Sequence, residues 1–363
     1  MTSFFELVLI TFFIMKPVSF EDIISFENLF KAHQRARLCK QHKREVINFE
    51  ANLSRNLWKL HYDLKYHKYK IGEYRKFMIY DPKEREIQAI PYCDRIVQHS
   101  VCDNLLIPLL EKHLINANCA CRKGKGTDYA IKLLRHFMTE HYKKYGNRGY
   151  FIKLDIKKYF PSIDHDVLYR KLERFNFDDD TKWLLHTIID SYGNGIGLPM
   201  GNQSSQCFAL LYLDRIDRIV KERLRIKFYV RYMDDMILID PDKDFLRNCW
   251  REIEKKLAEL GLELNKKTCL YPLKQGVKML QWKFIITSSG RIVRKMSKNK
   301  QSRQRRKLRK IYEKEKAGEY APGTARESLV SWIANAKRGD TWYERIKMIQ
   351  FFDDLEDNTN AKQ

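Results

Sequence analysis

The sequence lacks the paired cysteine spacings that mark a zinc site. Its eight cysteines are scattered, and the close pair Cys119 and Cys121 has no second pair to join it. This spacing favours reduced cysteines that pack as small core residues of a cytosolic protein over cysteines that bind a metal.

Long apolar runs are also missing. The longest, Phe4 to Met15, contains Glu6 and has no basic residue before it. It is too short to span a bilayer and lacks the positive start of a signal peptide, so we expect no membrane contact. Two interpretations stay open: an N-terminal helix docked on the body, or an upstream start codon, with residues 1–14 outside the native protein.

Acidic residues are too few to balance the basic ones. Sixty-nine Lys and Arg face 46 Asp and Glu, which leaves a net charge of +23 and predicts a polyanionic partner. With 44% hydrophobic residues the chain can still bury a core. Residues 291–316 hold thirteen Lys or Arg and two Glu, and a second basic cluster spans Lys31 to Arg44. The first is either a solvated face or a contact with a template–primer duplex, and we expect the second to bind structured RNA or an accessory subunit.

The chain has no internal repeat, and its order of elements predicts an α+β fold. We expect helices over 20–69, strands over 74–90 broken at Asp81-Pro82, helices over 94–114 and 129–145, and a strand over 149–155. Further helices are expected over 166–175, 182–192, 204–220 and 245–260, with a hairpin over 227–240 between them. We expect helices on one face of the sheet, a strand at 261–265, and a helical tail beyond Ile292.

Three acids lie at predicted strand ends. Asp155 ends the strand YFIKLD, while Asp234 and Asp235 fall at the turn of FYVRYMDDMILI. Burying such carboxylates is costly unless cations neutralise them, and converging carboxylates suit two hard divalent ions. An ordinary acidic β-turn is the alternative for the Asp-Asp pair.

Together, KLDIKKYFPSIDH, GLPMGNQSSQ and YMDD resemble in order and spacing the motifs of reverse transcriptases. The resemblance covers residues 70–345 and implies a right-hand polymerase, with an N-terminal helical extension at 1–69, fingers and palm at 70–285, and a basic helical thumb and tail at 286–363. It implies that Asp155 and Asp234 ligate two Mg²⁺, which Mn²⁺ can replace, with Asp235 in support and a backbone carbonyl from Ile156.

The same resemblance implies nucleotide-binding and duplex-binding residues. Phe160 would exclude ribonucleotides, Met200 would lie near the nascent base pair, and Lys266 or Lys267 could protonate pyrophosphate; core packing and solvated charge are the alternatives. Arg85 is the first choice for the triphosphate. The nucleotide-binding candidates are Lys83, Arg85, Arg95, Phe160, Met200, Gly201, Gln206 and Lys267. The candidates for template and primer phosphates are Arg303, Arg305, Arg306, Lys307, Arg309 and Lys310.

The chain is most similar to the enzymes of diversity-generating retroelements, because an aliphatic Met200 stands where most reverse transcriptases carry Gln. In that family an aliphatic residue there is linked to errors opposite template adenine, although Met is not its usual choice. The resemblance implies a template RNA with its cDNA heteroduplex, dNTPs, a basic helical accessory protein ring, and a bacterial or phage-encoded cytoplasmic enzyme.

Two alternatives remain: antiviral defence with a noncoding RNA, and a non-catalytic RNA-binding or splicing factor. The three intact acids argue against the second. We expect no RNase H activity, no maturase or endonuclease segment and, without a VTG tripeptide in the tail, no retron enzyme.

Overall fold

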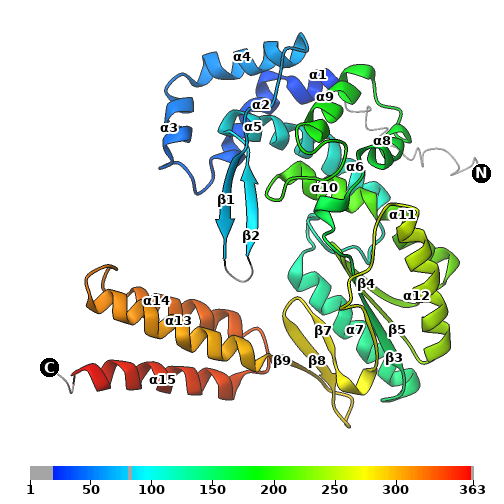
Figure 1. Ribbon diagram of the computed structural model, residues 1–363, viewed down its shortest axis with the longest axis vertical. Helices are drawn as coiled ribbons and strands as arrows, with labels where there is room; N and C mark the ends of the chain where they lie inside the picture. Colours follow the sequence, from blue (N-terminus) through cyan, green and yellow to red (C-terminus); the bar gives the residue numbers. More distant parts are fainter. Residues whose placement is uncertain (1–18, 81–83, 361–363) are drawn as a thin grey trace, which may run out of the picture. The chain divides into compact units, whose positions relative to one another are not determined.

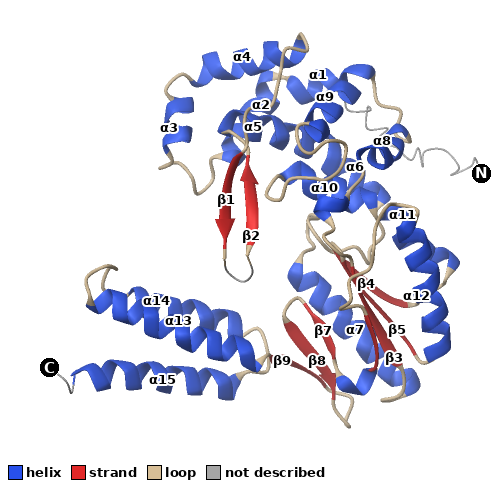
Figure 2. Cartoon of the chain, viewed as in Figure 1, coloured by secondary structure: helices blue, strands red, loops and turns tan. Residues whose placement is uncertain are grey.

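The computed structural model describes residues 19–80 and 84–360. The apolar run at 4–15, the Asp81-Pro82 turn and Lys83 lie outside these ranges. The chain divides into two compact units, shown in Figures 1 and 2. Unit 1 holds residues up to Leu114, Lys158–Asp214 and Leu260–Leu262; unit 2 holds Ile115–Lys157, Arg215–Glu259 and Glu263 onward.

Unit 1 begins with the predicted amphipathic region, which forms four helices. They are α1 (Phe20–Ile24), α2 (Phe26–Ala36), α3 (Arg44–Glu50) and α4 (Leu53–Lys65). Ser19 and Asp22 form a capping box at α1, and the Ser25 side chain caps α2, which explains the break between them. On α4, Leu57, Leu60 and Leu64 are buried, at the spacing that the sequence predicts for a core-facing stripe.

The rest of unit 1 contains one antiparallel hairpin and further helices. The hairpin pairs β1 (Arg75–Ile79) with β2 (Arg85–Ala89), in agreement with the two predicted strands. The helices are α5 (Tyr92–Val101), a π-helical turn (Cys102–Leu106), α6 (Ile107–His113), a 3₁₀ turn (Phe160–Ser162), α8 (His165–Glu173), α9 (Asp179–Asp190) and α10 (Gln203–Tyr212). The helix predicted over 204–220 is interrupted, because α10 ends at Tyr212 and is followed by α11 (Asp214–Arg218) and a π-helical turn (Ile219–Arg223).

Unit 2 is built on a four-stranded antiparallel sheet in the order β4-β5-β3-β6. The strands are β3 (Tyr150–Asp155), β4 (Phe228–Tyr232), β5 (Asp235–Asp240) and β6 (Cys269–Pro272), and the helices are α7 (Thr127–Tyr145) and α12 (Lys243–Ala258). The expectation of helices on one face is wrong. Phe151, Val230 and Ile237 join the α7 core, while the alternate residues Ile152 and Leu238 are buried too, and α12 packs against β3 and β5.

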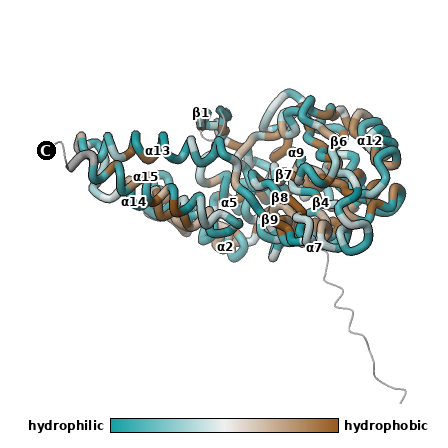
Figure 3. The backbone as a smooth tube through the Cα atoms, turned by 90° about the horizontal axis from the view of Figure 1, so that it is seen from below, coloured by the Kyte–Doolittle hydropathy of each residue, from teal (hydrophilic) through white to brown (hydrophobic). Residues whose placement is uncertain are grey.

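A second, three-stranded sheet and three helices complete unit 2. The sheet has the order β7-β8-β9, from β7 (Val277–Met279), β8 (Trp282–Ile286) and β9 (Ile292–Met296), preceded by a 3₁₀ turn (Leu273–Gln275). The tail beyond Ile292 therefore begins as a strand and not as the expected helix. The helices are α13 (Lys298–Lys316), α14 (Thr324–Ala336) and α15 (Trp342–Asn360), which share a small core that includes Leu308, Leu329 and Phe352. Figure 3 shows α13 as largely hydrophilic.

Within the described ranges, no helix is long and apolar enough to cross a membrane. All eight cysteines are free thiols, and Cys102, Cys119, Cys207 and Cys249 are buried.

Candidate active site

The β4–β5 hairpin brings the predicted acids together in unit 2. Tyr232 pairs with Asp235, so Met233 and Asp234 form a two-residue turn, and Met233 has φ +55°. A tight hairpin needs such left-handed backbone, which residues other than glycine rarely adopt. Asp155 on β3 also pairs directly with Asp235. Because residues opposite each other in an antiparallel pair share a face, the Asp155 and Asp235 side chains lie side by side, next to the turn that carries Asp234.

A buried ion pair supports this turn. Arg231 donates from Nε and Nη2 to the two carboxylate oxygens of Asp217, each at 2.7 Å, and from Nη1 to the Met233 carbonyl at 3.0 Å. The Tyr229 hydroxyl donates to the same carboxylate at 2.7 Å. Arg231 and Asp217 are 0% and 1% exposed. The pair is bidentate and fully enclosed, so it fixes the turn geometry tightly.

Sequence reasoning missed this support. Arg231 sits inside the apolar segment FYVRYMDD, and an arginine that interrupts a buried strand is a signal for a buried acidic partner. The partner could not be named from sequence, because Asp217 comes from a different element, α11.

The backbone of Asp155 is held by the segment that follows α12. Asn265 donates its amide to the Asp155 carbonyl at 2.7 Å, and Lys157 donates to the Glu263 carbonyl at 2.9 Å. Ile156 and Leu264 form an isolated bridge between these bonds, so the strand expected at 261–265 is reduced to this single bridge. Since carbonyls alternate along extended backbone, the Ile156 carbonyl points to the opposite side from that of Asp155.

One cation partly neutralises the three acids. Lys153 Nζ lies 2.8 Å from Asp235 Oδ1, and both side chains are about a quarter exposed or less. Burial raises the pKa of Asp234 to about 6, and the nearby charges of Asp235 and Asp155 act in the same direction. The Lys153 ammonium therefore offsets part of the negative charge that the three carboxylates bring together.

This donor set fits divalent cations. In the described part of the chain, no three His, Cys, Asp or Glu side chains form a ready-made metal cage. Mg²⁺, however, is commonly held by one or two carboxylates together with substrate phosphates and water. Asp234 supports the fit, since its raised pKa marks a carboxylate that lacks full compensation within the protein.

Comparison with known families decides the identity. The family model described as "Reverse transcriptase (RNA-dependent DNA polymerase)" matches residues 79–311, well over half of the chain. The chain belongs to the reverse transcriptase family. The match includes the three acids, and the expected enzyme class, RNA-directed DNA polymerase, is confirmed at the level of the family.

Other comparisons add little to this reverse transcriptase assignment. No curated protein matches the sequence. Among solved structures, an apo telomerase from Candida tropicalis is 14% identical over 68% of this chain and 53% of its own, with a TM-score of 0.44. A Candida albicans telomerase in complex with a TWJ fragment of telomeric RNA is 15% identical over 81% of this chain and 59% of its own, with a TM-score of 0.47. The chain thus spans less than two thirds of either telomerase, and the family assignment rests on the sequence model.

Most predicted nucleotide-binding residues of this reverse transcriptase lie in unit 1. The loop GLPMGNQSSQ, residues 197–206, joins β2 through the Gln88 backbone amide, which donates to the Met200 carbonyl at 3.4 Å. Gly201 has φ +122°, a backbone conformation that residues with a Cβ rarely adopt, so the turn here favours glycine. The Leu198 amide donates to the Phe160 carbonyl at 2.9 Å, which ties Phe160 to the same loop.

The remaining candidates differ in how they are held. Arg85 is exposed on β2, whereas Arg95 is turned inward, with Nη2 donating to the Ile90 carbonyl at 3.1 Å and Nη1 lying 3.6 Å from Glu45. Gln206 lies in the first turn of α10. In unit 2, Lys267 is exposed on the loop that bonds to Asp155, and its amide donates to the Asn265 side chain at 3.1 Å. Lys83 lies outside the described ranges.

The predicted duplex-binding residues all lie on α13. Arg303, Arg306, Lys307 and Lys310 are exposed, and Leu308 between them is buried in the core shared with α14 and α15. The guanidinium groups of Arg305 and Arg309 lie 5.4 and 5.7 Å from the Phe351 ring centroid on α15. These two arginines therefore also have a packing role.

Proposed function

We propose that this reverse transcriptase makes cDNA from a retroelement or noncoding RNA template by two-metal nucleotidyl transfer. The observation that carries the proposal is the strand register, which sets Asp155 opposite Asp235 beside the Asp234 turn. A packed sheet gains nothing from three neighbouring acids, so their position favours catalysis over a purely RNA-binding role.

The roles follow from the donors available. Asp155, Asp234 and the Ile156 carbonyl would hold two Mg²⁺, or Mn²⁺ in their place, with Asp235 as a supporting carboxylate. Such ions lower the pKa of an attacking hydroxyl and stabilise charge on the leaving pyrophosphate. Lys153 holds Asp235 through its ion pair, and Arg231 and Asp217 hold the turn. Lys83, Arg85 and Arg95 would bind the dNTP phosphates, and Lys267 would give a proton to pyrophosphate.

Primer extension tests the catalytic assignment. On an RNA template with a DNA primer, dNTPs and Mg²⁺, the wild-type chain should incorporate nucleotides, and the double variant Asp234→Ala/Asp235→Ala should not. The matched control is Asp240→Asn, which removes an acid at the other end of β5 and should leave activity intact. Full activity in the double variant would contradict the assignment.

We further propose that synthesis is error-prone at template adenines, as in diversity-generating retroelements. Met200 supports this, because a thioether in place of an amide removes one hydrogen-bonding check on the nascent base pair. The hydrogen bond from the Gln88 backbone amide to the Met200 carbonyl holds this residue beside β2.

Sequencing the cDNA made by Met200→Gln and by wild type on one template tests the fidelity role. Fewer errors opposite adenine are expected for Met200→Gln, while Met200→Leu, which keeps an apolar side chain, should resemble wild type. Equal error rates in all three enzymes would discard the role of Met200.

The biological setting that we propose is a bacterial or phage-encoded retroelement working in the cytoplasm with a basic helical accessory protein ring. Antiviral defence with a noncoding RNA uses the same chemistry and is the alternative. The flanking DNA separates the two: a repeat pair with a variable target gene supports diversification, and an isolated gene beside a noncoding RNA supports defence.

A further inference from the structure

Helix α4 in unit 1 and Tyr66, the residue that caps its C-terminus, carry a row of exposed aromatic rings. Trp58, Tyr62 and Tyr66 recur every four residues and are 43%, 50% and 60% exposed. The Trp58 and Tyr62 centroids lie 5.8 Å apart at an interplanar angle of 27°, and those of Tyr62 and Tyr66 lie 6.2 Å apart at 9°. At its first end the row rests on Phe26 of α2, 5.0 Å from Trp58. We call Trp58, Tyr62 and Tyr66 the aromatic ladder.

The fold of unit 1 does not require this ladder. The core-facing stripe of α4 is formed by Leu57, Leu60 and Leu64, which lie on another side of the helix. Exposed tyrosine and tryptophan in a nearly parallel row are a cost for a soluble protein unless the row meets a partner. The ladder is therefore a candidate binding surface.

Basic residues accompany the ladder. By helical position Arg55 and Lys59 lie on the ladder side, Lys59 at its border, where it also lines the neighbouring pocket. Within the described ranges neither side chain forms an ion pair. Lys65 also lies there and has only a distant partner, Glu21 at 3.8 Å. All three side chains are exposed. The combination of rings and cations on one face suits a nucleic-acid strand, which offers both planar bases and phosphates.

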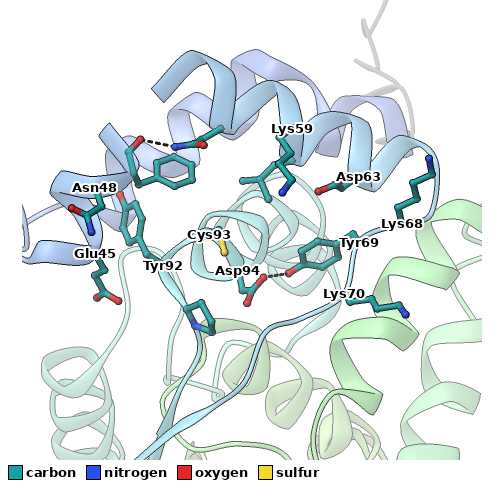
Figure 4. A pocket seen from close by; sticks show the side chains of 14 residues that line it. Glu45, Asn48, Lys59, Asp63, Lys68, Tyr69, Lys70, Tyr92, Cys93 and Asp94 are labelled. Carbon is teal, nitrogen blue, oxygen red and sulfur yellow. Dashed lines mark hydrogen bonds between the residues drawn. The ribbon is translucent and has the colours of Figure 1, made fainter. Parts of the chain in front are cut away.

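The pocket on the neighbouring side of α4 does not compete for this role. It has a volume of about 610 Å³ and is lined by residues of α3, α4 and the start of α5 (Figure 4). Lysines and acids are equally numerous along it, and its inner polar groups satisfy one another: Tyr69 donates to Asp94 at 2.8 Å, and the Gly72 amide donates to the same carboxylate at 2.9 Å. Its charge balance gives no preference for a polyanion.

We propose that the α4 face binds a single-stranded segment of RNA, with bases stacked on the aromatic ladder and phosphates on Arg55, Lys59 and Lys65. Rings with neighbouring cations form the platform by which proteins hold single strands without reading their sequence. A protein partner is the less suitable occupant, since burying a surface with three cations would require matching acids. Copying a template does not itself need this surface, so the proposal goes beyond the polymerase function.

Two triple variants separate base stacking from simple apolar contact. Trp58→Leu/Tyr62→Leu/Tyr66→Leu keeps apolar side chains and removes the rings, while Trp58→Phe/Tyr62→Phe/Tyr66→Phe keeps the rings. The full-length protein is first saturated with a blunt RNA–DNA heteroduplex to occupy the proposed duplex-binding residues. A fluorescent single-stranded RNA is then titrated, and binding is measured without dNTPs or Mg²⁺. The leucine variant should lose at least about tenfold in affinity, and the phenylalanine variant should stay near wild type.

A salt titration tests the phosphate contacts. Replacing Arg55, Lys59 and Lys65 by alanine should reduce the slope of log affinity against log salt by about 2, at about 0.7 per phosphate contact for a single strand. The leucine, phenylalanine and alanine variants should all stay folded, because the core-facing residues Leu57, Leu60 and Leu64 are unchanged; the leucine variant loses the Trp58–Phe26 contact, so its unfolding temperature is measured alongside.

Unchanged RNA affinity in the leucine variant would overturn the proposal. Equal losses of RNA affinity in the leucine and phenylalanine variants would overturn it as well. So would a leucine variant that keeps its RNA affinity but no longer binds a protein partner. Because the assay requires no catalysis, a failure of the polymerase proposal would leave its result interpretable.

Discussion

Asp234 is the residue at which catalysis and folding stability oppose each other. Its folded-state pKa of about 6 lies above the ordinary 3.8, so the native protein prefers the protonated form. The resulting stabilisation is fully present below about pH 3.8 and is lost as the pH rises through 6. At pH 7 the ionised carboxylate therefore destabilises the metal-free fold, and a bound cation would remove this destabilisation.

Replacing Asp234 with asparagine should stabilise the metal-free protein at neutral pH. The difference in unfolding free energy between Asp234→Asn and wild type should be about 2 kcal/mol larger at pH 7 than at pH 4. The reason is that only the ionised carboxylate destabilises the wild-type fold. Urea unfolding in the presence of EDTA at both pH values measures this. A difference between variant and wild type that does not change with pH would contradict the raised pKa.

At the residue scale, an acid in an apolar context could be singled out from sequence, whereas a partner from another element could not; the catalytic roles of the acids stay a prediction. Asp155, Asp234 and Asp235 could be picked out because an acid beside a buried strand is costly. Lys153 lies two residues before Asp155, on the same face of β3. Its ion pair with Asp235 nevertheless depends on the register between β3 and β5, which the sequence does not determine. The Arg231–Asp217 pair was missed for the same reason.

Helix α7 carries a fully buried histidine, His141, at its contact with the sheet. His141 is 0% exposed, both ring nitrogens lack hydrogen-bond partners within the described ranges, and its ring lies 5.8 Å from that of Phe228 on β4. Gly149 makes room for it, since a Cβ there would lie 2.7 Å from the imidazole. Burial lowers the pKa of His141 to about 4.

His141 should make the contact between α7 and the sheet sensitive to acid. Its neutral form is favoured in the folded state, so its contribution to stability is present above pH 6.5 and is lost as the pH falls toward 4. Between pH 7 and 4, wild type should lose about 3 kcal/mol more of its unfolding free energy than His141→Leu. The control His136→Leu, at an exposed position on the same helix, should follow wild type. Parallel curves for wild type and His141→Leu would refute this.

Element-level prediction succeeded for local patterns. The hairpin over 227–240 and the helices with clear apolar stripes were placed within a few residues, because both depend on periodicity and turn residues. The strand expected at 261–265 became one bridge, and β9 was taken for helix within a basic run. In both cases tertiary contacts decide: Ile292 and Met296 are buried in the core beneath α7, which overrides the basic composition of that segment.

At the scale of the whole molecule, the charge of +23 is concentrated in part on α13. Its exposed cations Arg303, Arg306, Lys307 and Lys310 lie on the outside of a helix that the buried Leu308 and Tyr312 anchor. The one-sided burial explains how so basic a helix remains part of a packed unit.

Removing these four charges should weaken binding to an RNA–DNA duplex in a salt-dependent way. Alanine at the four positions should lower the slope of log affinity against log salt by about 3 to 4, at about 0.9 per phosphate contact. The control variant replaces four exposed cations of α12 by alanine, so its net charge equals that of the α13 variant. These residues are Lys243, Arg247, Arg251 and Lys255. Equal slopes for the two variants would show that net charge and not α13 governs binding.

Asp155 is the residue at which to test whether acids from separate strands form one polymerase site. Primer extension on an RNA template compares wild type with Asp155→Asn, whose fold is checked by its unfolding temperature. Asp155 lies on β3, outside the YMDD hairpin. It can therefore be needed for DNA synthesis only if β3 and the hairpin bring their acids together. We expect Mg²⁺-dependent DNA synthesis by the wild type and a rate at least about 100-fold lower in the variant. Wild-type synthesis by a folded Asp155→Asn enzyme would contradict it.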